Sequence, residues 1–118
     1  MNICIEKLYP LLIEYVDDMS AQSISNVIWA LGKMNVTYNR LPPILSKKLL
    51  HRVGTKAIDL NDQGLANIIW GMYKMKMVGS SLHIGVQGAI GTTLSRVCLH
   101  MTPHSAGVTL YSLGKIRV

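Results

Sequence analysis

The apolar residues of this chain recur at the spacing of α-helices, and one apolar pattern is written three times. Residues 25–34 read Ser-Asn-Val-Ile-Trp-Ala-Leu-Gly-Lys-Met, residues 66–75 read Ala-Asn-Ile-Ile-Trp-Gly-Met-Tyr-Lys-Met, and residues 107–116 give a weaker third copy. The interval from Trp29 to Trp70 is 41 residues, and Tyr111 follows after another 41. A fixed period of about 20–50 residues indicates stacked repeats. We therefore predict an all-α fold, an α-solenoid of antiparallel helix pairs with a 41-residue repeat.

The three helices that carry this pattern, here called the A helices, are predicted at about 20–35, 61–77 and 102–117. Ser20, Asn61 and Thr102 precede them at equivalent positions, and all three are good N-caps. Pro103 falls at a first helical position, where its missing N–H costs nothing. In the first two copies, one broad apolar face is predicted to pack on the intervening helices. These faces comprise Ile24, Val27, Ile28, Leu31 and Met34, then Leu65, Ile68, Ile69, Met72 and Met75.

The intervening B helices are predicted at about 2–17, 41–57 and 81–99. Pro10 should either kink the first of them or mark a late start near Tyr9. Asn39 and Ser80 are candidate caps for the second and third. Three glycines in the third helix weaken it, and their spacing predicts a smooth ridge in close contact with a neighbouring helix. The glycines of the ridge are Gly85, Gly88 and Gly91. The second helix should turn an apolar face inward, with Leu41, Ile44, Leu45, Leu49 and Val53. Its cations should face solvent: Lys47, Lys48, Arg52 and Lys56.

The register makes the whole chain, 1–118, a single solenoid fragment. It starts with the second half of a repeat (1–18), continues with two full repeats (19–59 and 60–100), and ends with the first half of another (101–118). Each pair buries its apolar face only by stacking on its neighbours. The last A helix has no B helix after it, so we expect a neighbouring protein or further repeats to cover 102–117.

Charge favours a polyanionic partner for the repeats. The net charge is +6, but residues 1–18 carry four acids and one Lys, or −3, and residues 19–118 carry eleven Lys or Arg and two Asp, or +9. Solubility is the plainer explanation.

Cys4 and Cys98 lack metal-site spacing and are interpreted as packing residues. No apolar run approaches the ~18 residues of a membrane span, and the N-terminus lacks the features of a targeting peptide. No metal, cofactor or catalytic constellation is predicted, so an enzyme is the least favoured class.

At 100° per residue, the face of each A helix opposite the apolar one carries an amide or imidazole, an aromatic ring and a cation. Single-stranded RNA recognition uses these groups: edge hydrogen bonds, a stacking plane and a phosphate counter-charge. We therefore predict an RNA-binding stripe across the three helices. Its candidate residues are Gln22, Asn26, Trp29 and Lys33, then Gln63, Asn67, Trp70 and Lys74, then His104, Tyr111 and Lys115, with Val108 in place of the second amide.

Each group also has a plainer interpretation. Trp29 and Trp70 would serve equally well as wedges between adjacent A helices. The asparagines would satisfy backbone groups of a neighbouring repeat, and a lysine in a last turn complements the helix dipole. Small residues on both flanks of the A helices would let them lie close together, with Tyr73 as the exception. One flank comprises Ser23, Ala30, Gly64, Gly71, Ser105 and Ser112, and the other comprises Ser25, Gly32, Ala66, Gly107 and Gly114.

The motif Gln-x-x-Ser/Ala-Asn-x-x-Trp-Ala/Gly-x-x-Lys-Met, at 22–34 and 63–75, resembles the helical repeats of organellar RNA-binding proteins. These are the octotricopeptide and heptatricopeptide repeats, the latter often found with a RAP domain and related to FAST-kinase-like repeats. The resemblance implies a non-catalytic α-solenoid that acts on mitochondrial or plastid RNA in processing, stability, translation or organellar ribosome assembly. The alternative is a protein-interaction scaffold or a structural subunit of a large complex.

Overall fold

The computed structural model describes residues 4–77 and 82–116, which form six α-helices linked by short turns and contain no strand. The predicted all-α class is confirmed. The helices are α1 (Tyr9–Tyr15), α2 (Ala21–Lys33), α3 (Pro43–Lys56), α4 (Asp62–Lys74), α5 (Ile84–Val97) and α6 (Pro103–Ile116).

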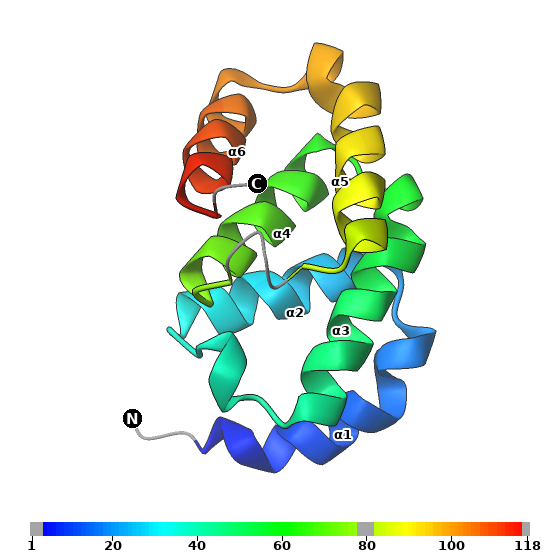
Figure 1. The fold of residues 1–118 in the computed structure, drawn as a ribbon, viewed down its shortest axis with the longest axis vertical. Helices are drawn as coiled ribbons and strands as arrows, with labels where there is room; N and C mark the ends of the chain where they lie inside the picture. Colours follow the sequence, from blue (N-terminus) through cyan, green and yellow to red (C-terminus); the bar gives the residue numbers. More distant parts are fainter. Residues whose placement is uncertain (1–3, 78–81, 117–118) are drawn as a thin grey trace.

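The helices form two rows along the long axis of a molecule measuring 40 × 27 × 25 Å. In one row α4 packs between α2 and α6, and in the other α3 packs between α1 and α5 (Figure 1). The core lies between the rows, because the apolar faces of the A helices turn toward the B helices. Its most deeply buried side chains include Ile24, Ile28, Leu45, Leu49, Leu65, Ile68 and Met72.

Polar caps begin the three A helices as predicted. The Ser20 hydroxyl accepts a hydrogen bond from the Ser23 N–H at 3.1 Å, and Asn61 Oδ1 accepts one from the Gly64 N–H at 2.7 Å. The Thr102 hydroxyl accepts a hydrogen bond from the Ser105 N–H at 3.1 Å. Each cap satisfies an amide that has no partner inside its helix.

The helices α2 and α4 end earlier than the predicted 35 and 77. Asn35 and Lys76 adopt left-handed backbone angles, with φ of 58° and 60°. The N–H of the residue that follows then points back into the helix. Val36 N–H donates to the Leu31 carbonyl in this way at 3.0 Å. Met77 donates to the Met72 carbonyl in the same way at 3.1 Å. This closure stops a helix without a glycine, and it leaves Met34, predicted to be in the apolar face, 49% exposed.

The ends of the B helices are corrected in several places. The helix α1 begins at Tyr9 with Pro10 in its first turn, so the late start is confirmed. Asn39 lies in a separate 3-10 turn and does not cap α3, which Pro42 precedes. The cap of α5 is His83, whose Nδ1 accepts from the Gly85 N–H at 3.0 Å; Ser80 lies outside the described residues. The packing role predicted for the two thiols is wrong, because Cys4 and Cys98 are exposed.

The helix α3 buries most of its predicted inner face, but Ile44 is 54% exposed and Leu50 is buried in its stead. Two of its cations are tied to α1 and the residues that follow it rather than facing solvent freely. Lys48 Nζ lies 3.4 Å from Asp17 Oδ2 and from the Ile13 carbonyl oxygen. Arg52 Nε donates to the Met19 carbonyl at 2.8 Å. These two side chains therefore fasten α3 to the end of α1.

The glycine ridge predicted for α5 is wrong. A Cβ built on Gly88 or Gly91 would meet nothing within 4 Å, and one on Gly85 would meet only the His83 ring. The glycines face solvent because the buried face of this helix is formed by Val86, Ile90, Thr93 and Val97.

Replacing an open glycine of α5 by alanine should stabilise the protein. Gly91→Ala adds helix propensity and reduces the freedom of the unfolded chain without a steric cost. We expect the free energy of unfolding, measured by urea denaturation, to rise by about 0.5–1 kcal/mol. Gly88→Ala provides a second, independent site. Unchanged or lower stability in both variants would contradict the solvent-facing placement.

Candidate functional site

Two glycines set the spacing between α2 and α4. A Cβ on Gly71 would lie 2.5 Å from the Ile28 carbonyl oxygen, and one on Gly32 would lie 2.8 Å from the Gly71 Cα. Both contacts are with backbone, so neither position accepts a side chain unless the helices move apart. The small flanks predicted from the sequence do bring these two helices together. On α6, by contrast, Gly107 and Gly114 have no neighbour within 4 Å of a Cβ.

We call the contact between α2 and α4 the first seam and the contact between α4 and α6 the second seam. The second seam is formed by different residues. Tyr73 occupies the position that Gly32 has on α2, and Ser112 occupies that of Gly71. The Tyr73 ring meets the Tyr111 ring edge-on, with centroids 5.7 Å apart. A side-chain hydrogen bond with Tyr111 raises the pKa of the Tyr73 hydroxyl above its ordinary value. A bulky ring thus takes the place of a glycine that is in close contact with the neighbouring backbone at the first seam.

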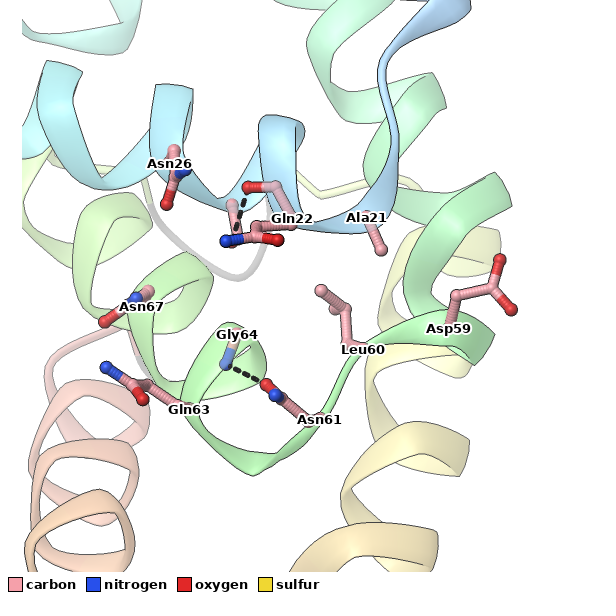
Figure 2. Close-up of a pocket in the computed structure, with 10 residues that line it drawn as sticks. Ala21, Gln22, Asn26, Asp59, Leu60, Asn61, Gln63, Gly64 and Asn67 are labelled. Carbon is pink, nitrogen blue, oxygen red and sulfur yellow. Dashed lines mark hydrogen bonds between the residues drawn. The ribbon is translucent and has the colours of Figure 1, made fainter.

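A polar groove opens between α2 and α4 on the side away from the core (Figure 2). Its volume is about 360 Å³, and the amides of Gln22 and Asn26 project from α2 toward those of Gln63 and Asn67 on α4. Within the described chain, none of these four amides forms a side-chain hydrogen bond. The asparagines are therefore not occupied by backbone groups of a neighbouring helix, and all four amides can bind other molecules.

An equivalent groove of about 320 Å³ lies between α4 and α6. Gln63 and Asn67 line it from α4, at the positions that Gln22 and Asn26 have in the first groove. On α6 the amides are replaced by His104 and Val108. The same kind of groove therefore recurs one 41-residue step along the chain, with one face preserved and the other altered.

The aromatic residues form a row across the A helices, next to the grooves. Trp29 and Trp70 face each other across the first seam with centroids 6.0 Å apart and planes tilted by 31°. They pack between helices, as the wedge interpretation required, yet Trp29 keeps 40% of its surface exposed. At the second seam Trp70 and Tyr111 line a further groove of about 430 Å³, together with Pro103, His104, Gly107 and Val108.

The lysines form a third row in the last turns of the same helices. Lys74 Nζ lies 6.0 Å from the Trp70 ring centroid, and Lys115 Nζ lies 5.4 Å from that of Tyr111. Lys33 and Lys115 are exposed and Lys74 is half-buried. The two ion pairs found in the described part of the chain, Lys48–Asp17 and Lys56–Asp59, leave this row without a carboxylate partner.

Charge therefore changes along the A helices. The lysines mark one end of the surface, whereas Asp59 and Asp62 line the grooves near the other end. Lysine lies close to an aromatic ring over the C-terminal turns, so that end offers cations to an anionic group. The predicted stripe is thus a surface on which amides, aromatic rings and cations follow one another in separate rows.

Sequence reasoning missed the residues that close these grooves, above all Asn61, Asp62 and Pro103. Asn61 lines the first groove and Thr102, its equivalent one period later, lines the second. The repeat register therefore contained the signal that these caps also belong to a recurring surface.

No protein-family model, curated protein or solved structure matches the chain. In the ranges 4–77 and 82–116, no helix is long and apolar enough to cross a membrane. Nor do three or more His, Cys, Asp or Glu side chains of these ranges gather where they could hold a metal ion.

Proposed function

We propose that this chain is a non-catalytic RNA-binding module, and that its helix pairs are consecutive repeats of an α-solenoid with a 41-residue period. The observation that carries the proposal is the recurrence of one groove at two seams, with amide, aromatic and lysine rows in register. A surface repeated at fixed steps suits a ligand that is itself repetitive, and single-stranded RNA is such a ligand.

The arrangement of rows suggests how a strand would lie. Its phosphates would follow Lys33, Lys74 and Lys115, where no carboxylate competes among the described residues. Its bases would point from there toward the aromatic row, and their edges would reach the amides beyond it. The strand would thus cross the A helices rather than run along any one of them.

The resemblance of the repeats to octotricopeptide and heptatricopeptide proteins supports a mitochondrial or plastid setting. There the module would act in RNA processing, stability or translation, or in organellar ribosome assembly. The partner RNA would be an unpaired transcript segment or an exposed ribosomal RNA loop, because stacking needs bases released from a helix.

A second candidate function, a protein scaffold, is favoured by apolar side chains around α5 and α6. Leu110 is 75% exposed, Leu99 is 87% exposed and Ile84 is 81% exposed. Leu110 belongs to the face for which we expect a neighbouring protein or further repeats. None of these three side chains belongs to the amide, aromatic or lysine rows, so a protein contact at any of them would be compatible with RNA binding.

Salt dependence tests the proposed function. Fluorescence anisotropy with a labelled single-stranded oligouridine should show binding at low salt, and log K should fall linearly as log salt rises. Contact with three phosphates gives a slope of about −2, taking about −0.7 per contact for a single strand. A duplex of the same length serves as the control and should bind more weakly. A folded protein that binds no single strand at low salt would contradict the proposal.

A further inference from the structure

We infer that the groove between Trp70 and Tyr111 is a slot for one unpaired nucleobase, and that the strand inserts a base there and not between Trp29 and Trp70. The inference rests on the proposed function and assigns unequal roles to the two seams. The seam between α2 and α4 acts as a closed support, and the seam between α4 and α6 acts as the binding site.

The two seams differ in what already occupies the space between their rings. At the first seam, the contact between Gly32 and Gly71 holds α2 and α4 close together, and the indoles of Trp29 and Trp70 meet with centroids 6.0 Å apart. Parallel rings that enclose a base must be about 7 Å apart, twice the spacing of ~3.5 Å at which carbon atoms make contact. The tilted Trp29–Trp70 pair is too close for a base to enter.

At the second seam the pairing of the rings differs. Tyr111 lies edge-on against Tyr73, which has replaced the small residue of the first seam. Trp70 and Tyr111 both line an open groove of about 430 Å³ at this seam. Trp70 also packs against Trp29, so one of the two rings is held in place before any ligand binds.

The lining of the slot combines aromatic, apolar and polar groups that can hold a base: Trp70, Tyr111, Pro103, Val108 and His104. The rings of Trp70 and Tyr111 offer stacking to a flat base, and Gly107 leaves its part of the lining free of a Cβ. His104 adds a ring nitrogen that can pair with a base edge. Lys74 Nζ and Lys115 Nζ lie over the Trp70 and Tyr111 rings, where a cation would neutralise the phosphates that flank an inserted nucleotide.

Filling the slot tests the inference. Gly107 lines the groove and Gly114 does not, although both are exposed glycines of α6 with open space where a Cβ would be. Gly107→Leu should therefore block the slot and leave the fold intact, and Gly114→Leu is its matched control. The probe is an oligouridine carrying one 2-aminopurine, whose fluorescence falls when the base stacks.

We expect binding to wild type and to Gly114→Leu to quench the probe. Gly107→Leu should abolish the quenching and weaken binding about 5- to 150-fold, the value of one stacked base. Equal quenching and affinity in Gly107→Leu would overturn the slot and leave RNA binding standing. Equal losses in both variants would also overturn it, because the whole flank would then be responsible. Absence of binding by wild type would overturn the proposed function itself.

Discussion

Gly71→Ala should destabilise the protein by about 1–3 kcal/mol, even though alanine is the better helix former. The added methyl group would lie 2.5 Å from the Ile28 carbonyl oxygen and 2.8 Å from the Ile28 carbonyl carbon. Both are backbone atoms inside α2, so no side chain can rotate to make room. The helices must separate, and their separation would also part Trp29 from Trp70.

Urea denaturation measures this loss, and Gly91→Ala is the matched comparison because the same substitution there meets open space. The two variants should shift the free energy of unfolding in opposite directions. A drop in near-ultraviolet circular dichroism from the tryptophan pair should accompany the Gly71 variant alone. Stability equal to that of wild type in Gly71→Ala would mean that α2 and α4 do not approach as closely as described.

Removing the lysine row should have the largest effect on RNA binding. The triple variant Lys33→Gln, Lys74→Gln and Lys115→Gln loses three phosphate contacts, which at about 0.7 per contact flattens the salt slope by about 2. The same count predicts an affinity lower by about 100-fold at 0.1 M salt. The fold should persist, because these side chains make no ion pair among the described residues.

The control for this variant removes the same charge from the other row of helices. Lys7 and Lys47 are exposed, and Lys56 makes only a long contact of 3.9 Å with Asp59. Their triple replacement by glutamine lowers the net charge equally but should change affinity by only a few-fold, through long-range attraction. Equal losses in the two triple variants would show that net charge, and not the lysine row, drives binding.

Local features of the fold could be predicted from the sequence. The caps at Ser20, Asn61 and Thr102 depend only on a polar side chain and the turn that follows it, and all three form. The ends of α2 and α4 could not be predicted in this way. The left-handed residues that stop these helices are Asn35 and Lys76, and lysine is an ordinary helix former that gives no warning of a stop.

Features that depend on the packing of two helices were predicted from the sequence less often. Residues at helical spacing share one face of a helix whatever surrounds that helix. The line of side chains from Gln22 to Lys33 could therefore be predicted from their spacing. Which flank of α5 meets a neighbour depends on the placement of α3, and its glycines were therefore assigned to the wrong side. The grooves belong to pairs of helices, and the two seams differ because Tyr73 and Ser112 stand where the first seam has Gly32 and Gly71.

The most direct test of RNA binding by the surface of the A helices uses the two tryptophans. They give two indole N–H signals in a proton–nitrogen NMR spectrum. Both lie in the aromatic row, Trp29 on α2 and Trp70 on α4. On titration with single-stranded oligouridine, we predict that both indole signals shift, Trp70 by the larger amount, while most α3 amides stay in place. Indole signals that do not move while α3 and α5 amides shift, or a spectrum that does not change at all, would contradict this account.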